Sequence, residues 1–156
     1  MARRAVVIVA STRAAAGIYE DRSGPIAVEF LRRMGFDTPN ALIVPDAEID
    51  EALNTVFAEG PSVILTSGGT GISPDDATVE AVSAHLTKEL PGIAHAFYAA
   101  SASVPTAALS RTVAGVNART FAMALPGSTG GVKDGCKVLK PLLPHIIDQL
   151  EGKHEH

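Results

Sequence analysis

The sequence predicts an α/β fold, a single-domain three-layer sandwich in which helices cover both faces of a mainly parallel sheet. Short apolar segments with the composition of buried strands alternate with stretches in which apolar residues recur at helical spacing. This alternation is typical of proteins built around a parallel sheet. Two glycine-rich segments also follow strand-like runs directly, at the position where such folds place their binding loops.

Composition excludes several other classes of protein. The 156 residues leave room for one domain, and a chain with 46% hydrophobic and 19% charged residues is too apolar to be disordered. A net charge of −4 excludes the overall basic surface of a nucleic-acid-binding protein. The single cysteine, Cys136, excludes an internal disulfide framework and a zinc site with several cysteines. We expect a cytoplasmic protein that binds no nucleic acid.

The first strand is expected over Ala5–Ala10, a run of six apolar residues. A secretory signal needs an apolar core of about 7–15 residues, and a membrane span needs about 20. The run is too short for either, and an uninterrupted apolar run is typical of a strand covered on both faces. We therefore expect a buried strand and no contact with a membrane.

The rest of the first half predicts two helices and two strands from apolar spacing and from the glycines and prolines that end each element. In order, they are a helix through Ile26 and Met34 that ends at Gly35, a strand over 41–44, a helix through Ile49 and Phe57 that ends at Gly60, and a strand over 62–66.

The second half predicts three helical regions and two strands by the same signals. The first is a helix through Val79, Val82 and Leu86, with Pro91-Gly92 beyond its end, and the second is a helix through Ile93 and Ala100. Strands over 113–116 and 120–125 then form a hairpin or lie side by side. The last helical region carries the apolar residues from Val138 to Leu150 and is broken near Pro141 and Pro144. We expect residues 1–152 to form the domain and residues 153–156 to be a flexible tail.

The two glycine-rich loops, Ser67–Gly71 and Gly127–Gly131, suggest a site for phosphate groups. Glycine lets backbone N–H groups approach an oxyanion, and the helix expected after each loop adds the partial positive charge of its N-terminus. Neither loop has the P-loop pattern. Each loop alone could equally be a tight turn that needs glycine for its backbone angles. Two such loops at one edge of the sheet favour binding.

Carboxylates follow the same strands. Asp46 comes after the second strand, and Asp75 and Asp76 come after the first glycine loop. Carboxylates beside a phosphate site imply a divalent cation, and Mg²⁺ is commonly held by one or two carboxylates together with phosphate oxygens and waters. The alternatives are that Asp46 is a turn residue after Pro45 and that Asp75 or Asp76 is the N-cap of the next helix.

Other polar residues are weaker candidates. Arg13 and Arg111 could hold phosphate or be ordinary surface charges, and Ser23 could support the site or be the N-cap of the first long helix. The histidines show no metal-ligand spacing, and a buried thiol is the expected state of Cys136.

The segment Thr66–Thr78 (TSGGTGISPDDAT) resembles the signature of the MogA/MoaB-like proteins of molybdenum cofactor synthesis. In outline that signature reads T-[TS]-G-G-T-G, a short spacer and D-x-T. The resemblance extends from the first strand to the last helix. The other matching segments are Ser11–Arg13 with Gly17, Asp21, Ser23 and Gly24, then Val44–Asp46, Glu89–Gly92, Leu109–Arg111 and Leu125–Ser128.

This resemblance implies a molybdopterin adenylyltransferase that transfers AMP from Mg²⁺-ATP to the terminal phosphate of molybdopterin and releases pyrophosphate. It implies a homotrimer or a multiple of one, and hand-over of the product to a molybdenum-insertion protein. It makes Asp46 and Asp76 the catalytic acids and the Mg²⁺ ligands. By the same resemblance the phosphate-binding residues are Ser67, Gly68, Gly69, Thr70, Gly71, Pro126, Gly127 and Ser128, with Thr12, Arg13, Asp21, Ser23, Glu89 and Arg111 in supporting positions.

Some positions depart from the family pattern. His95 and Tyr98 stand where Glu and Arg are common, and Asp75 stands where a basic residue is common. These changes remove charges expected near substrate, so two alternatives stay open. One is a MoaB-like protein that binds or carries molybdopterin without efficient adenylyl transfer, and the other is a scaffold module. Because Asp46, Asp76 and the first glycine loop are all present, we expect an enzyme.

Overall fold

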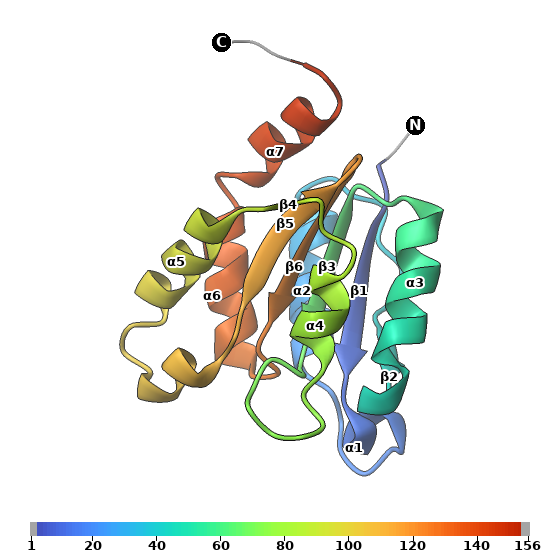
Figure 1. The fold of residues 1–156 in the computed structure, drawn as a ribbon, viewed down its shortest axis with the longest axis vertical. Coiled ribbons are helices and arrows are strands. Elements are labelled where there is room, and N and C mark those ends of the chain that lie inside the picture. The colour runs from blue at the N-terminus through green and yellow to red at the C-terminus, as the bar shows by residue number, and fades with distance from the viewer. Residues whose placement is uncertain (1–2, 154–156) are drawn as a thin grey trace.

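The computed structural model describes residues 3–153, which form a six-stranded sheet in the order β2-β1-β3-β6-β5-β4 between two helical layers (Figure 1). The first four strands in this order are parallel, β5 is antiparallel to β6, and β4 is antiparallel to β5. The predicted α/β fold with a mainly parallel sheet is confirmed. The strands are β1 (Ala5–Ala10), β2 (Leu42–Val44), β3 (Val63–Ser67), β4 (Lys88–Glu89), β5 (Val113–Asn117) and β6 (Thr120–Leu125).

The helices join these strands in chain order and pack on both faces of the sheet. The α-helices are α1 (Thr12–Ala15), α2 (Ser23–Arg33), α3 (Ile49–Glu59), α4 (Thr78–Ser83), α5 (Pro91–Ala100), α6 (Thr129–Leu139) and α7 (Leu143–Leu150), and the short 3₁₀ helices are η1 (Asp46–Glu48) and η2 (Pro105–Leu109).

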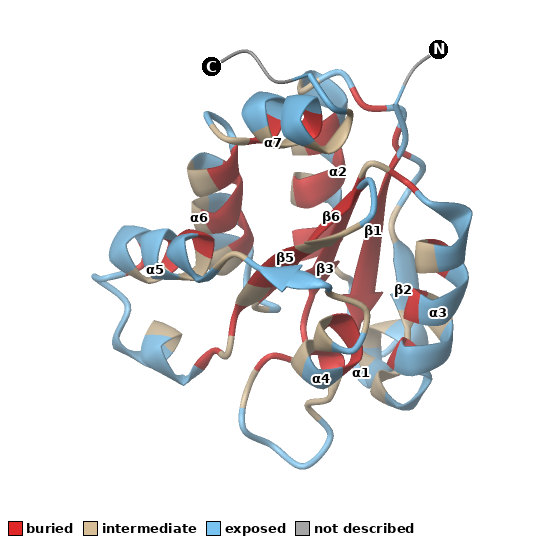
Figure 2. Ribbon diagram, turned by 45° about the horizontal axis from the view of Figure 1, so that its top comes forward, coloured by how far each residue is buried: buried red, intermediate tan, exposed pale blue. Residues whose placement is uncertain are grey.

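The core consists of two apolar layers because successive strand residues point to opposite faces of the sheet. In β3, Val63 and Leu65 pack in the layer beneath α2, α5, α6 and α7, whereas Ile64 packs in the layer beneath α3 and α4. Figure 2 shows the buried strands between helices whose outer faces are exposed. A sheet covered on both faces explains why β1, β3 and β6 read as nearly continuous apolar runs.

Cys136 lies in α6, and its thiol is buried as expected. Its burial raises the pKa of the thiol to about 11, because an apolar environment disfavours the charged thiolate. The thiol is therefore neutral at physiological pH, and we assign it to packing.

Two predictions about elements are wrong in detail. Leu86 lies beyond α4, which ends at Ser83. Pro91 lies beyond the end of α4 as predicted, and it begins α5, a position that proline tolerates because the first helical N–H has no partner within the helix. Pro144 lies in the first turn of α7 for the same reason, so only the break near Pro141 occurs.

Two short elements give no readable sequence signal. The helix α1 has four residues, and β4 has two exposed residues that pair with β5 at the edge of the sheet (Figure 2). The hairpin reading of β5 and β6 is confirmed. Among residues 3–153, no helix is both long and apolar enough to cross a bilayer.

The predicted tail lies mostly outside the described residues. Lys153 is described, and its backbone N–H donates to the carbonyl of Asp148 over 2.8 Å while its side chain lies 3.6 Å from a carboxylate oxygen of Glu151. Residues 154–156 are not among the described residues, so the flexibility of the tail stays a prediction.

Candidate functional site

The four parallel strands end at one edge of the sheet, which we call the rim: the segments that follow Ala10, Val44, Ser67 and Leu125, together with residues 110–112 before β5. Residues 110–112 reach this edge because β5 runs the other way and Val113 pairs with Ala124. In Figure 1, α1 and the loop between β3 and α4 lie together at this end, opposite α7. The order of connection along the chain reverses between β1 and β3, which is where open α/β sheets bind ligands.

The first glycine loop passes very close to β1. Gly68 has a φ of 93°, and a Cβ at that position would overlap the carbonyl oxygen of Ala10. Its N–H donates to the carbonyl of Leu125 over 3.0 Å and so joins β3 to β6. For Gly68 the turn-forming alternative therefore holds, because its N–H group is already used within the fold.

Gly69 leaves room for the start of α4. It has a φ of 73°, and a Cβ would overlap the hydroxyl of Thr78. The N–H of Thr78 donates to the carbonyl of Gly69 over 3.1 Å. The Thr78 hydroxyl is buried and has no hydrogen-bond partner among residues 3–153. Glycine is required at both positions, 68 and 69, for the loop to fold back onto the rim.

Ser67 connects three segments of the rim. Its hydroxyl donates to the carbonyl of Pro126 over 3.0 Å and lies 2.8 Å from the hydroxyl of Ser23. The Ser67 side chain is fully buried. We infer that Ser67 holds the two glycine loops together, because a buried hydroxyl with two protein partners is closed to a ligand.

Asp21 and Ser23 organise the start of α2. The Asp21 carboxylate accepts hydrogen bonds from the N–H of Gly24 at 2.9 Å and from the hydroxyl of Ser23 at 2.8 Å. The N-cap position belongs to Arg22, and Ser23 is the first helical residue, so the N-cap alternative for Ser23 is wrong.

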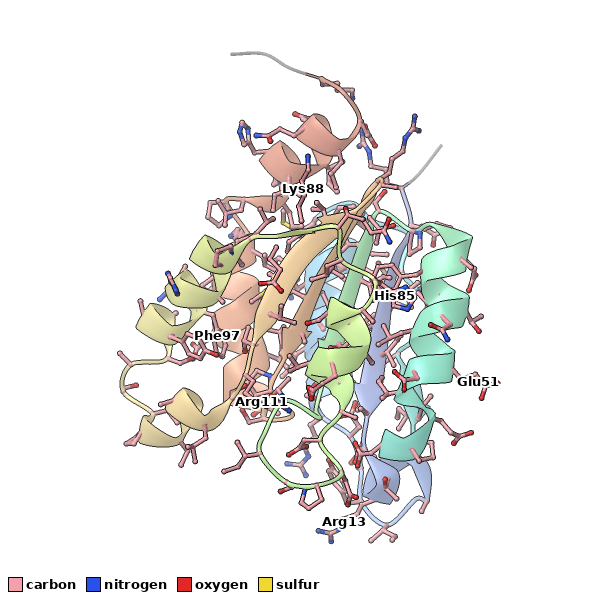
Figure 3. All side chains as sticks on the ribbon, viewed as in Figure 1. Arg13, Glu51, His85, Lys88, Phe97 and Arg111 are labelled. Carbon is pink, nitrogen blue, oxygen red and sulfur yellow. The ribbon has the colours of Figure 1, made fainter. Side chains whose placement is uncertain are left out.

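Thr70 and Arg111 fasten the first glycine loop to the segment before β5. The hydroxyl of Thr70 lies 2.8 Å from that of Ser110, and the backbone N–H of Arg111 donates to the carbonyl of Thr70 over 2.8 Å. The Arg111 guanidinium donates to the carbonyl oxygens of Gly71 at 2.9 Å and Asp76 at 3.3 Å. Figure 3 shows Arg111 beside the loop that joins β3 to α4.

The Arg111 guanidinium also forms an ion pair with Glu80, in which one nitrogen lies 2.9 Å and 2.7 Å from the two carboxylate oxygens. The hydrogen bond from Arg111 lowers the pKa of Glu80, and the same bond raises the pKa of Arg111. Arg111 thus holds the loop between β3 and α4 in place, through contacts that the sequence pattern did not indicate. Glu80 is a site residue that the sequence analysis missed.

Asp76 closes a small turn at the far end of this loop. Its Oδ2 accepts a hydrogen bond from the N–H of Ser73 at 2.9 Å, and a Cβ on Gly71 would come within 2.7 Å of the same oxygen. The N-cap position of α4 is Ala77, without a side-chain hydrogen bond, so the N-cap alternative is wrong for both Asp75 and Asp76. The side chain of Asp75 is exposed.

Asp46 is held by Thr12 across the rim. The Thr12 hydroxyl donates to Oδ2 of Asp46, and the N–H of Asp46 donates back to that hydroxyl oxygen, both over 3.1 Å. The contact joins the start of α1 to the end of β2. Thr12, which was only a supporting candidate, therefore positions one of the two acids directly.

The two acids suit Mg²⁺ in chemistry, because carboxylate oxygens are its preferred protein ligands. In each of Asp46 and Asp76, Oδ2 has a protein partner, whereas Oδ1 has none within residues 3–153. The described part of the chain contains no group of three or more His, Cys, Asp or Glu side chains placed to hold a metal. A magnesium ion at the rim would therefore need phosphate and water oxygens to complete its six ligands.

A hollow of about 360 Å³ lies between the segment 19–23, at the start of α2, and the second glycine loop. The Ser128 hydroxyl there accepts from the N–H of Gly131 over 3.0 Å and caps α6, so the N–H groups of the first turn of α6 face the rim. Arg13 lies over the ring of Tyr19, with 5.8 Å between its guanidinium carbon and the ring centroid. The hollow is lined by Tyr19, Glu20, Asp21, Arg22, Ser23, Gly127 and Thr129.

Glu89 lies apart from the other candidates. It is exposed on β4, and the strands β5 and β6 stand between it and β3. With a spacing of about 4.8 Å between neighbouring strands, β4 lies about 14 Å from β3. The structure therefore brings all the other candidates to the rim and leaves Glu89 on the outermost strand, β4.

Tyr98, which the sequence marked only as a departure from a pattern, contacts the rim from α5. Its hydroxyl donates to the carbonyl of Ser110 and accepts from the N–H of Thr112 at 3.0 Å. No local signal reveals these contacts, because they join residues 12 and 14 positions apart through the fold.

Comparison with known proteins agrees with this geometry. Residues 6–145 match the family described as "Probable molybdopterin binding domain". The chain is 35% identical over 149 residues to a molybdopterin adenylyltransferase of Pyrococcus furiosus (90% of this chain, 87% of the relative). It is 37% identical over 155 residues to a molybdenum cofactor biosynthesis protein B of Staphylococcus carnosus (94% and 89%).

Other relatives are longer. The chain is 36% identical over 152 residues to a molybdenum cofactor biosynthesis bifunctional protein of Chlorobaculum tepidum, covering 96% of this chain and 49% of the relative. A second bifunctional relative, from Synechococcus elongatus, is covered to 47%. The chain thus spans about half the length of these two relatives.

Solved structures give the same result. The molybdopterin biosynthesis Mog protein of Mycobacterium ulcerans has a TM-score of 0.91 and 44% identity, with 97% of this chain and 99% of that chain covered. The molybdopterin biosynthesis enzyme MoaB of Thermus thermophilus has a TM-score of 0.86 and 35% identity (97% and 98%). The glycine loops and acids at the rim, together with these matches, show that the chain belongs to the MogA/MoaB family of molybdopterin-binding domains.

Proposed function

We propose that this protein is a molybdopterin adenylyltransferase of molybdenum cofactor synthesis. The observation that carries the proposal is the convergence of both glycine loops and both acids, Asp46 and Asp76, on one edge of the sheet. The Pyrococcus furiosus relative, a molybdopterin adenylyltransferase that is 35% identical over most of the chain, supports it. Family membership supports the binding of molybdopterin, and the acids support the transfer step.

The reaction joins two anions. An oxygen of the terminal phosphate of molybdopterin attacks the α-phosphorus of ATP, the new P–O bond forms there, and the bond to the β-phosphate breaks with its electrons leaving on pyrophosphate. No protein nucleophile is needed, so the protein contributes positioning and charge compensation. The first turn of α6, capped by Ser128, offers backbone N–H groups and a partial positive charge to one phosphate group.

Asp46 and Asp76 would hold Mg²⁺ through the oxygens that lack protein partners. When bound, the ion supplies positive charge that offsets the repulsion between the phosphates. Thr12 fixes the carboxylate of Asp46, and the N–H of Ser73 fixes that of Asp76, so each acid is oriented before substrate binds. Preorganised charge of this kind contributes to the rate because it needs no rearrangement during the reaction.

Assembly as a homotrimer, with hand-over of the product to a molybdenum-insertion protein, is part of the proposal. Apolar side chains are exposed on the edge strand β2 at Leu42 and Ile43 and around η2 at Val104 and Leu109. Exposed apolar surface of this kind is available for contact between subunits. Light scattering is expected to give three times the chain mass of 16.1 kDa.

The test is a mass-spectrometric product assay with the purified protein, molybdopterin, ATP and Mg²⁺. We expect adenylylated molybdopterin and pyrophosphate in equal amounts. Asp76→Asn removes the charge but keeps the size, and it should slow turnover by about 100-fold or more. Asp75→Asn is the matched control, because this neighbouring carboxylate is exposed and accepts no hydrogen bond among the described residues; its rate should match wild type.

The second candidate is a protein that binds molybdopterin without adenylyl transfer. It is favoured by the match to MoaB-type proteins, which is as strong in identity as the match to the adenylyltransferase. Saturable binding of molybdopterin by wild type without any product would establish this alternative. In that case Asp76→Asn should bind molybdopterin as wild type does.

A further inference from the structure

We propose that Tyr98 is a positioning residue: its hydroxyl fixes the segment 110–112 and, through Arg111, holds the loop that carries Asp76. The consequence for catalysis rests on the proposed function. The consequence for the loop rests on the geometry alone and can be measured without substrate.

The first link joins α5 to the segment before β5. The Tyr98 hydroxyl donates to the carbonyl of Ser110 and accepts from the N–H of Thr112, so it occupies one backbone group on each side of Arg111. Ser110 and Thr112 are buried, and a buried backbone group without a partner is costly. The Tyr98 ring is itself held edge-on against Phe97, whose side chain is fully buried in the core, with 5.5 Å between ring centroids.

The second link joins Arg111 to both ends of the Asp76 loop. The backbone N–H of Arg111 reaches Thr70, and its guanidinium reaches the carbonyls of Gly71 and Asp76. The residues between these carbonyls are largely exposed, with Ile72 at 73%. Apart from the turn between Ser73 and Asp76, the polar contacts between this loop and the body of the protein come from the segment 110–112. They are the contacts of Arg111 and the 2.8 Å contact between the hydroxyls of Thr70 and Ser110. Figure 3 shows its side chain reaching the loop from the β5 side.

The two links act in series. Removing the Tyr98 hydroxyl frees the segment 110–112, which lets the guanidinium move away from Gly71 and Asp76. The loop then opens more often by local unfolding, while the strands on either side keep their stability. Asp76 spends less time in its working position, and catalysis is sensitive to displacements of about 1 Å.

The experiment compares wild type with Tyr98→Phe, which removes the hydroxyl and keeps the ring. Amide hydrogen exchange is measured on the unliganded protein and read at the amides of Ser73 and Asp76, which are the N–H groups of residues 70–77 that donate hydrogen bonds. Loss of one or two hydrogen bonds should raise the exchange rate of these amides by about 5- to 30-fold. Exchange in β3 and α6 should stay as in wild type.

Ser101→Ala is the matched control. Ser101 follows α5 directly, and its buried hydroxyl donates to the carboxylate of Asp134 on α6 over 2.7 Å. This variant removes a hydrogen bond near the same helix without touching the rim. Exchange of residues 70–77 should therefore be unchanged in Ser101→Ala.

A double-variant cycle separates positioning from general loosening. In an Arg111→Ala background the guanidinium contacts to Gly71 and Asp76 are already lost, while the backbone bond from residue 111 to Thr70 remains. Tyr98→Phe should therefore add much less to the exchange rates of Ser73 and Asp76 than it does in the wild-type background. Additive effects would overturn the proposal, because independent sites add and members of one chain of contacts do not. Wild-type exchange of the loop in Tyr98→Phe would overturn it too, as would faster exchange throughout the protein.

Kinetics test the catalytic part. If the protein adenylylates molybdopterin, Tyr98→Phe should lower kcat by about 10-fold and leave KM within about 2-fold, because the acid is displaced while the substrate contacts remain. An unchanged kcat alongside a faster-exchanging loop would overturn the catalytic part. Absence of product from wild type would overturn the proposed function instead, and the exchange measurements would still decide the role of Tyr98.

Discussion

Gly68 sets how closely the first glycine loop approaches β1. Its positive φ favours glycine, and its Cα faces the carbonyl oxygen of Ala10 with no room for a side chain. A glycine-rich motif in a sequence suggests phosphate binding. At this residue, however, the fold itself requires both the absence of a Cβ and the hydrogen bond donated by the N–H group. The glycines of such a motif therefore divide between building the loop and serving a ligand.

Gly68→Ala should destabilise the protein by about 3 kcal/mol or more, because a strained backbone conformation and an overlap with β1 each cost about 1–3 kcal/mol. Gly17→Ala is the matched control: Gly17 also has a positive φ, of 74°, but open space surrounds it. It should lose only about 1–2 kcal/mol from backbone strain. Urea denaturation measures both, and equal losses would show that the contact with Ala10 contributes nothing.

Residues that follow a strand or a glycine loop in the sequence were predictable, whereas contacts between distant residues were not. Asp46 comes directly after β2 and Pro45, and Asp76 comes shortly after the first glycine loop, so topology places both at the rim. The role of Arg111 depends on Glu80, 31 positions earlier, and that of Tyr98 depends on the path of the chain before β5. No spacing rule connects such pairs, because their distance is set by the packing of α5 and the reversal of β5.

The helix α6 packs against β6 at a point where it has no side chain. A Cβ on Gly135 would overlap the end of the Leu125 side chain and lie 3.2 Å from its Cγ. Leu125 is fully buried and directly precedes Pro126 at the start of the second glycine loop. The approach of this helix to the sheet thus helps to fix the loop that caps α6.

Gly135→Ala should destabilise the protein by about 1–3 kcal/mol although alanine favours helix, because overpacking at a buried contact outweighs a propensity gain of about 1 kcal/mol. Gly130→Ala, in the same helix but with open space around it, should be neutral or slightly stabilising. Thermal or urea unfolding of the two variants gives the comparison. A stabilised Gly135→Ala would mean that α6 can shift away from Leu125 without cost.

Element prediction followed the same division between local and distant signals. The strands β1 and β6 were predicted at their observed bounds, because uninterrupted apolar runs between polar residues define them. The strand β4 was missed because two residues cannot show alternation and its pairing with β5 is purely tertiary. The helix α4 was predicted too long, because Leu86 continues the apolar spacing after the backbone has left the helix.

The arrangement of the sheet joins these parts into one unit. The segments of the rim leave β2, β1, β3 and β6, which are four consecutive strands of the sheet, beginning at the edge strand β2. Strand order could not be read from the sequence, although the alternation of strands and helices predicted the parallel sheet. The rim could therefore be predicted as a place, whereas its internal contacts required the fold.

Because the rim draws on four neighbouring strands, a ligand that binds there should stabilise the molecule against global unfolding. A ligand present at 100 times its dissociation constant stabilises the folded state by about 2.7 kcal/mol, which for a domain of this size raises the midpoint of thermal unfolding by about 5–11 °C. We expect such a shift in wild type with molybdopterin, and a further shift with ATP and Mg²⁺.

In Asp46→Asn the shift with ATP should lose its dependence on Mg²⁺, whereas the shift with molybdopterin should remain, because the carboxylate acts through the ion. Scanning calorimetry at several ligand concentrations measures both shifts. An unchanged midpoint in wild type at millimolar concentrations of both ligands would contradict binding at the rim, whatever the assay for product gives.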